Sequence, residues 1–98
     1  MVFRESNEQS LKQVIEELLK SYRIEGKMYE HMLISKYPEV VGPMIARYTE
    51  NLRIRNRILF LQISSSVVKN ELSYAREKLT KSLNEAAGKD IIDKIVIK

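Results

Sequence analysis

The spacing of apolar residues changes along this chain of 98 residues, and that change constrains its fold more than any other feature. Apolar side chains first recur every three to four residues, which is the period of an amphipathic helix. From residue 52 they alternate with arginines, as in a strand with one wet face, and beyond residue 66 the helical period returns. The pattern predicts helices over residues 7–22 and 27–37, a helical turn over 44–48, strands over 52–55 and 58–63, a long helix ending at Gly88, and a third strand over 91–97.

Short-range signals mark the ends of these elements. Ser6 to Gln9 matches a capping box that would begin the first helix. Pro38 lacks a backbone N–H and restricts the residue before it, so we expect the second helix to break or kink there. One of the serines at 64–66 should cap the long helix, and Gly88 is a natural residue to end it.

The order of these elements is α-α-β-β-α-β, which indicates an α+β protein. Asn56-Arg57 is expected to form the tight turn of a hairpin, because Asn tolerates positive φ. The long helix connects the second strand to the third, so it should cross one face of a three-stranded sheet. The length fits one domain over residues 1–98, with residues 1–6 as a flexible N-terminus.

Composition and charge limit the location and the partners of the chain. There is no cysteine, and the first ten residues lack the apolar stretch of a signal peptide, so we expect a cytoplasmic protein. The apolar runs are too short to cross a bilayer, so no membrane partner is expected. Residues 1–50 carry a net charge of −1 and residues 51–98 a net charge of +5, an asymmetry that can steer a protein toward a polyanion.

Residues that would support catalysis are missing. His31 is the only histidine, and its sequence neighbours offer no metal-ligand or acid–base set, so a surface or packed histidine is the simpler interpretation. The serines at 64–66 lack a nucleophile elbow and are explained by helix capping. Three scattered glycines do not form a phosphate-binding loop. We therefore expect no enzymatic activity, no cofactor and no small-molecule substrate.

A row of arginines is the most suggestive local feature. Arg53 and Arg55 are two residues apart and leave the same face of the predicted strand. Arg57 would continue the row if the strand runs on to the turn, and Arg47 lies just upstream. Planar guanidinium groups suit phosphate oxygens and stacking on bases. The alternative is that these charges protect a sheet edge from unwanted pairing.

Other candidates for nucleic-acid contact lie on the long helix. Lys69 and Arg76 decorate its surface beside the apolar stripe. Aromatic stacking is the other part of single-strand recognition, for which Tyr48 and Tyr74 are candidates, whereas Phe60 is expected in the core. The predicted nucleic-acid-binding residues are Arg47, Arg53, Arg55, Arg57, Lys69 and Arg76.

Four segments in order resemble the DciA family. Residues 37–49, Tyr-Pro-Glu-Val-Val-Gly-Pro-Met-Ile-Ala-Arg-Tyr-Thr, are similar to its signature W-x-x-(I/V)-V-G-x-x-(I/L)-A-x-x-(S/T), with Tyr37 in place of Trp. Residues 59–66 resemble its L-x-V-x-(V/S)-x-S strand. Asn70-Glu71-Leu72 and residues 83–88 resemble its x-E-L helix start and its L-N-x-x-x-G ending. The resemblance covers roughly residues 10–97.

The resemblance implies a bacterial accessory protein of DNA replication with a K-homology-like domain. It implies binding of DNA, for which we favour single strands, recruitment or loading of the replicative helicase DnaB, and no ATPase activity. The chain has no G-x-x-G loop, the phosphate clamp of K-homology domains. Two alternatives stay open, an RNA-binding K-homology-like module and a protein-interaction module without affinity for nucleic acid.

Overall fold

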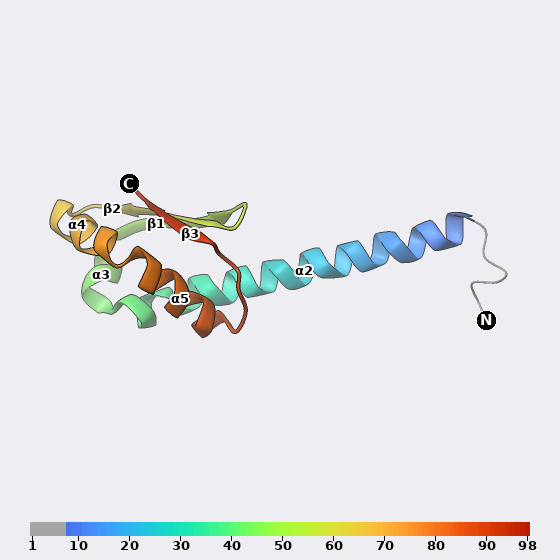
Figure 1. Cartoon of the computed structure of the whole chain (residues 1–98), viewed down its shortest axis with the longest axis horizontal. Helices are drawn as coiled ribbons and strands as arrows, with labels where there is room; N and C mark the ends of the chain where they lie inside the picture. Colours follow the sequence, from blue (N-terminus) through green and yellow to red (C-terminus); the bar gives the residue numbers. More distant parts are fainter. Residues whose placement is uncertain (1–7) are drawn as a thin grey trace.

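The structure is a computed structural model that describes residues 8–98. It is an α+β fold in which one long helix leads into a small sheet with further helices (Figure 1). The predicted flexible N-terminus and the capping serine at position 6 lie outside the described residues. The elements are α2 (Glu8–Val41), α3 (Pro43–Arg47), β1 (Thr49–Arg55), β2 (Ile58–Ile63), α4 (Ser66–Tyr74), α5 (Arg76–Ala87) and β3 (Lys94–Ile97).

The sheet has the strand order β1-β2-β3. β1 and β2 are antiparallel, and the turn between them places Asn56 and Arg57 at φ values of 52° and 63°, as a two-residue hairpin turn requires. β2 and β3 are parallel, so the chain must cross from one end of the sheet to the other, which it does through α4 and α5. The predicted order of elements and the three-stranded sheet are confirmed.

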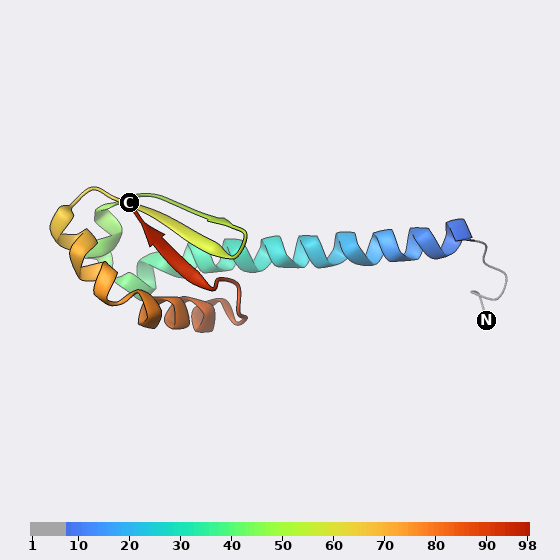
Figure 2. The same cartoon turned by 45° about the horizontal axis from the view of Figure 1, so that its top comes forward.

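The core lies between one face of the sheet and the helices, which all lie on that side of it (Figures 1 and 2). Every second residue of β2 points into it, and the last third of α2 and the middle of α5 cover it. The fully buried side chains are those of Leu33, Tyr37, Leu59, Leu61, Leu83 and Ile92.

A single helix replaces the two helices predicted before residue 38. α2 runs without interruption through Gly26 and Pro38. A glycine inside a helix costs only about 1 kcal/mol relative to alanine. Pro38 lies near the end of α2, where Tyr37 on one side and Val40 and Val41 on the other pack on the core. Tertiary packing therefore holds the last helical turn despite the missing N–H, and the break predicted at Pro38 is wrong.

The predicted long helix is divided in two at Ala75. This residue leaves helical geometry at φ −109° and ψ 14°, ends α4 by donating to the Leu72 carbonyl, and begins α5. The signals at the two outer ends are confirmed. Ser65 Oγ accepts from Val68 N at 3.2 Å, and Gly88 ends α5 in the left-handed conformation at φ 86°.

The segment 37–49 is a structural unit around a buried tyrosine. Tyr37 Oη and Thr49 Oγ1 are 2.9 Å apart, and Thr49 donates to the Ile45 carbonyl at 2.9 Å. Burial raises the pKa of Tyr37 above its usual value, an effect that its bond to Thr49 only partly offsets. Gly42 has the positive φ of 90° that lets the chain turn from α2 into α3. The first and last positions of the resembling segment thus meet each other in the fold.

Candidate nucleic-acid interface

The sheet has a second face, which none of the described helices covers (Figures 1 and 2). In β1, Leu52 and Ile54 pack toward the core, so their neighbours Arg53 and Arg55 point away from it. β3 continues its ladder to Lys98, which is bonded to Leu61 and Ile63 of β2. The pairing register arranges the outward residues in rows, Arg55–Ile58–Lys94, Arg53–Phe60–Val96 and Asn51–Gln62–Lys98.

Phe60 lies at the centre of this outer face. The Arg53 guanidinium carbon is 5.2 Å from the centroid of its ring, within the range of a cation–π contact. The expectation that Phe60 belongs to the core is therefore wrong. β2 is almost entirely apolar, which suggested burial on both faces, but helices cover only one face and leave the Phe60 side half-buried. Beside it a shallow depression is lined by Asn51, Arg53, Phe60, Leu61, Gln62 and Lys98.

The charges in these three rows are all of one sign. Arg53, Arg55, Lys94 and Lys98 occupy four of the positions in the three rows, and no acidic residue occupies any of them. Arg53, Arg55 and Lys94 are exposed. Cations grouped around an aromatic ring produce a positive potential over a surface that can also stack on a flat ligand.

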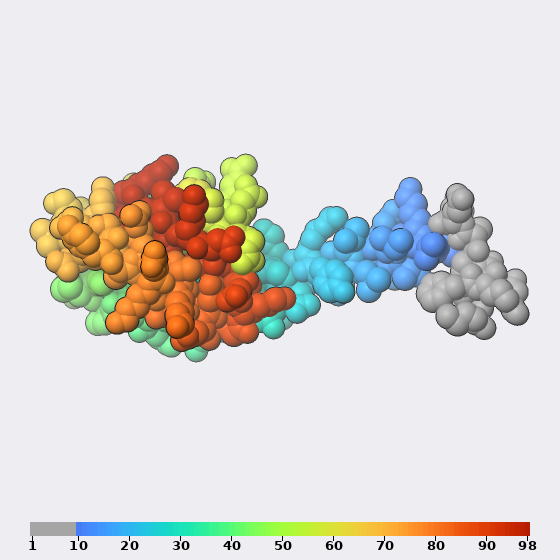
Figure 3. All heavy atoms as spheres, in the orientation of Figure 1, coloured from blue at the N-terminus to red at the C-terminus, as the bar shows by residue number. Residues whose placement is uncertain are grey.

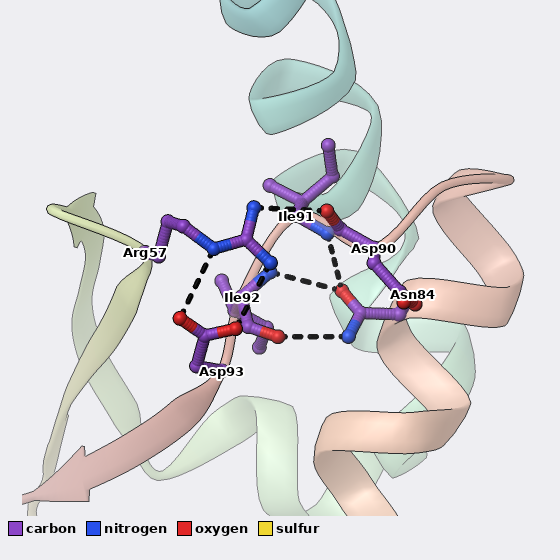
Figure 4. Close-up of polar contacts among 6 residues, drawn as sticks. All are labelled: Arg57, Asn84, Asp90, Ile91, Ile92 and Asp93. Atoms are coloured by element: carbon purple, nitrogen blue, oxygen red, sulfur yellow. Dashed lines mark hydrogen bonds and ion pairs between the residues drawn. The ribbon is translucent and has the colours of Figure 1, made fainter.

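Arg57 does not continue the row, because β1 ends at Arg55 and the turn redirects the next two residues. Its guanidinium forms a two-pronged ion pair with Asp93, with Nε 3.0 Å from Oδ2 and Nη2 2.9 Å from Oδ1 (Figure 4). Its Nη1 donates to the Asp90 carbonyl at 3.0 Å. The hydrogen bond between the two side chains raises the pKa of Arg57 and lowers that of Asp93. This arginine joins the hairpin turn to the loop that precedes β3.

Asn84 holds the other side of the same loop, and its amide side chain is buried (Figure 4). Its Oδ1 accepts from the N–H groups of Ile91 and Ile92 at 2.9 and 3.1 Å, and its Nδ2 donates to the Ile92 carbonyl at 2.9 Å. An amide that satisfies three backbone groups fixes where β3 begins. It therefore sets the register that brings Lys94 to the outer face.

The other predicted site residues are dispersed. Arg47 is the exposed last residue of α3, and Lys69 is exposed on α4. Arg76 begins α5, donates to the Ser73 carbonyl at 3.3 Å, and lines a groove with Lys94 at the free side of β3. The structure thus brings Arg53 and Arg55 together on one face, leaves Arg76 near its margin, and places Arg47 and Lys69 on other elements.

The sequence interpretation missed Phe60, Lys94 and Lys98. Lys94, Val96 and Lys98 alternate with the buried Ile95 along the last strand, which is the period of a strand with one wet face. That signal was available, but nothing local shows that this strand lies beside β2. Tyr48 and Tyr74, the predicted stacking residues, are not among the outward positions of the strands.

The arrangement defines a class of small α+β domains in which a three-stranded sheet is covered by helices on one face only. Within that class, the family model described as "Dna[CI] antecedent, DciA" matches residues 10–97, and the chain belongs to the DciA family. The comparison with curated proteins gave no match, nor did the comparison with solved structures. Membership indicates a DnaB-related role in DNA replication. No helix within residues 8–98 is both long and apolar enough to cross a membrane.

Proposed function

We propose that this chain is a non-catalytic accessory of bacterial DNA replication that binds single-stranded DNA on the outer face of its sheet. The observation that supports this proposal is the half-buried Phe60 ring on the uncovered face, with Arg53 over it and Arg55, Lys94 and Lys98 around it. Every base has a flat face that stacks on an aromatic ring, and each phosphate offers oxygens to the neighbouring cations.

The dimensions of the face suit a short stretch of one strand. Neighbouring strands are about 4.8 Å apart and alternate residues about 6.7 Å apart, so the three rows cover roughly 10 by 13 Å. The sheet surface of an RNA-recognition motif stacks two or three bases on a similar platform. A rigid duplex would bring its bases to this face only by their edges, whereas an unpaired strand can lay them flat on Phe60.

Salt-dependent binding tests this assignment. Fluorescence anisotropy with a labelled single-stranded oligonucleotide at two salt concentrations should show binding that weakens steeply as salt rises. The double variant Arg53→Ala/Arg55→Ala should bind more weakly and reduce the salt slope by about 1.4, since each lost phosphate contact with a single strand contributes about 0.7.

A matched control removes the same charge elsewhere. Lys78→Ala/Lys81→Ala takes two exposed cations from α5 on the helical side of the domain. It should leave affinity close to that of the unchanged chain. Equal weakening by the two double variants would mean that only net charge matters, and the outer face would lose its assignment.

The helicase step is proposed from family membership. We propose that the chain recruits or loads DnaB. Retention of purified DnaB by the tagged chain after nuclease treatment would support this step. Absence of any complex with DnaB would contradict it without affecting the DNA-binding proposal. Competition between RNA and DNA of matched sequence distinguishes the DNA-binding proposal from the alternative of a K-homology-like RNA-binding module, because only RNA presents the 2′-hydroxyl.

A further inference from the structure

The first half of α2 extends away from the domain (Figure 3). Most of its apolar side chains are exposed to water. Leu33 and Tyr37, near the other end of the same helix, are fully buried. Leu11, Ile15 and Leu18, in contrast, are 50, 49 and 52% exposed. The chain extends 64 Å along its longest axis and only 21 and 19 Å along the others, so this projecting section is a large part of its length.

These exposed residues form one continuous stripe. At 100° per residue, the apolar residues between 11 and 22 fall within an arc of roughly 140°. We call them the α2 stripe, which consists of Leu11, Val14, Ile15, Leu18, Leu19 and Tyr22. Leu33 and Tyr37 fall on the same side of the helix by the same geometry. The face that α2 buries in the domain therefore continues into solvent.

A projecting helical section of this kind is expected to pack its apolar face against a partner. Most of the stability of a helix in a protein comes from packing its apolar face, and contiguous exposed apolar surface marks an interaction site. The stripe spans twelve residues, about 18 Å of helix, which is too much apolar length for scattered surface residues.

The spacing within the stripe fits a second copy of the same helix. Its members pair symmetrically about the midpoint between residues 16 and 17, as Leu11 with Tyr22, Val14 with Leu19, and Ile15 with Leu18. A two-fold axis at that midpoint would superpose the pattern on itself when a second helix runs in the opposite direction. Such an isologous contact, in which residue i meets j and j meets i, is how symmetric dimers are built.

Charge supports the same occupant. Residues 8–27 hold four acidic and four basic residues, a net charge of zero, whereas the whole chain carries +4. A neutral section neither repels its copy nor attracts a polyanion. Glu16, Glu17 and Lys20 with Gln13 lie together on the polar side, away from the stripe.

We propose that the α2 stripe is a dimerisation surface on which a second copy of this chain packs antiparallel. The proposal does not depend on nucleic-acid binding. It places the two sheets at opposite ends of an assembly longer than one chain. The contact is short, so the dimer should be weak and should form progressively as protein concentration rises.

Two isoleucines of α2 allow a matched test on the full chain. Ile15 belongs to the stripe and is 49% exposed, whereas Ile24 is 54% exposed and falls on the opposite side of the helix. Analytical ultracentrifugation from about 10 to about 500 µM should show the mass rise from one chain toward two. Ile15→Lys should raise the dissociation constant about tenfold or more, because it places a charge in an apolar contact. Ile24→Lys should leave it within about twofold.

Folding and orientation are checked separately. Both isoleucines lie outside the buried core, so both variants should keep the thermal unfolding midpoint of the sheet domain. Small-angle scattering of the dimer should give a maximum dimension well above the 64 Å of one chain, as the antiparallel arrangement requires. A single-chain mass at every concentration, equal effects of the two variants, or a dimer no longer than one chain would each overturn the proposal.

Discussion

The two faces of the sheet are built from the same strands but differ in what covers them. On the inner face Leu59, Leu61 and Ile95 are packed under α2, α4 and α5, and their exposed fractions are 3% or less. On the outer face Phe60 lies between cations and solvent. The difference indicates a division of roles, because removing an inner side chain should affect stability alone and removing an outer one should affect binding.

The strongest test of this division removes an inner side chain. Leu59→Ala should lower the free energy of unfolding by about 2–5 kcal/mol, because it leaves a cavity at a fully buried position. Urea denaturation measures the effect. Ile58→Ala, the adjacent change on the outer face, should cost less than about 1 kcal/mol. Equal losses at the two positions would show that both faces are covered, which would contradict the comparison.

Asn84 connects the two faces, since it fixes the loop from which β3 starts. Asn84→Ala should destabilise the fold by about 2–3 kcal/mol, because two buried N–H groups and one carbonyl lose their partner. It should also weaken DNA binding, because Lys94 depends on the same register. Asn70→Ala, an exposed change on α4, serves as the control for both measurements. Unchanged stability would mean that β3 holds its register without this amide.

Phe60 provides the opposite test, in which a change on the outer face should weaken DNA binding and leave stability almost unchanged. Phe60→Leu keeps apolar bulk but removes the ring, so DNA affinity should fall by about 1–2 kcal/mol, roughly 5- to 30-fold. The free energy of unfolding should change by less than about 1 kcal/mol, since leucine keeps most of the apolar contact and only the cation–π contact with Arg53 is lost. Anisotropy and urea denaturation on the same samples give both values.

The control for the ring is Tyr74, which is 84% exposed at the end of α4. Tyr74→Leu removes an aromatic ring that is more exposed than Phe60 and lies outside the sheet. It should leave DNA affinity unchanged if stacking takes place on the outer face. A larger loss at Tyr74 than at Phe60 would move the candidate interface from the sheet to the helices.

The sequence predicted the elements better than it predicted the two faces. Ser65 and Gly88 act within a few residues, and for that reason the helix ends they mark were found. Pro38 carries an equally clear local signal, but packing on the core outweighs it. An almost entirely apolar strand such as β2 does not reveal which face is open, which is why the sequence places Phe60 in the core.

The site was harder to predict because it is assembled from distant parts of the chain. Arg53 and Arg55 could be paired because they share one strand. Lys94 and Lys98 reach the same face only through the parallel pairing of β2 with β3, which no local pattern specifies. The ion pair that holds the Arg57 side chain likewise depends on Asp93, which is far along the chain.

The smallest expected effect on stability concerns the ion pair between the hairpin turn and the loop before β3. Arg57 and Asp93 are both exposed, so their ion pair should contribute little stability. Because the pKa of Asp93 is lowered by its bond to Arg57, the folded state binds fewer protons than the unfolded state just below the ordinary value of 3.8. Stability from the pair is therefore present above that pH and is lost as pH falls through the lowered pKa.

Asp93→Asn is the variant that isolates this contribution. Its thermal unfolding midpoint should lie slightly below that of the unchanged chain at pH 7, and the difference should shrink as pH falls below 3.8 and vanish below the lowered pKa of Asp93. Asp90→Asn is the matched control, because Arg57 is bonded to the Asp90 backbone carbonyl and interacts with its carboxylate only through a weaker coulombic attraction. A difference that persists in strong acid would show that Asp93 acts through the backbone of the loop, so that the turn is joined to β3 without the ion pair.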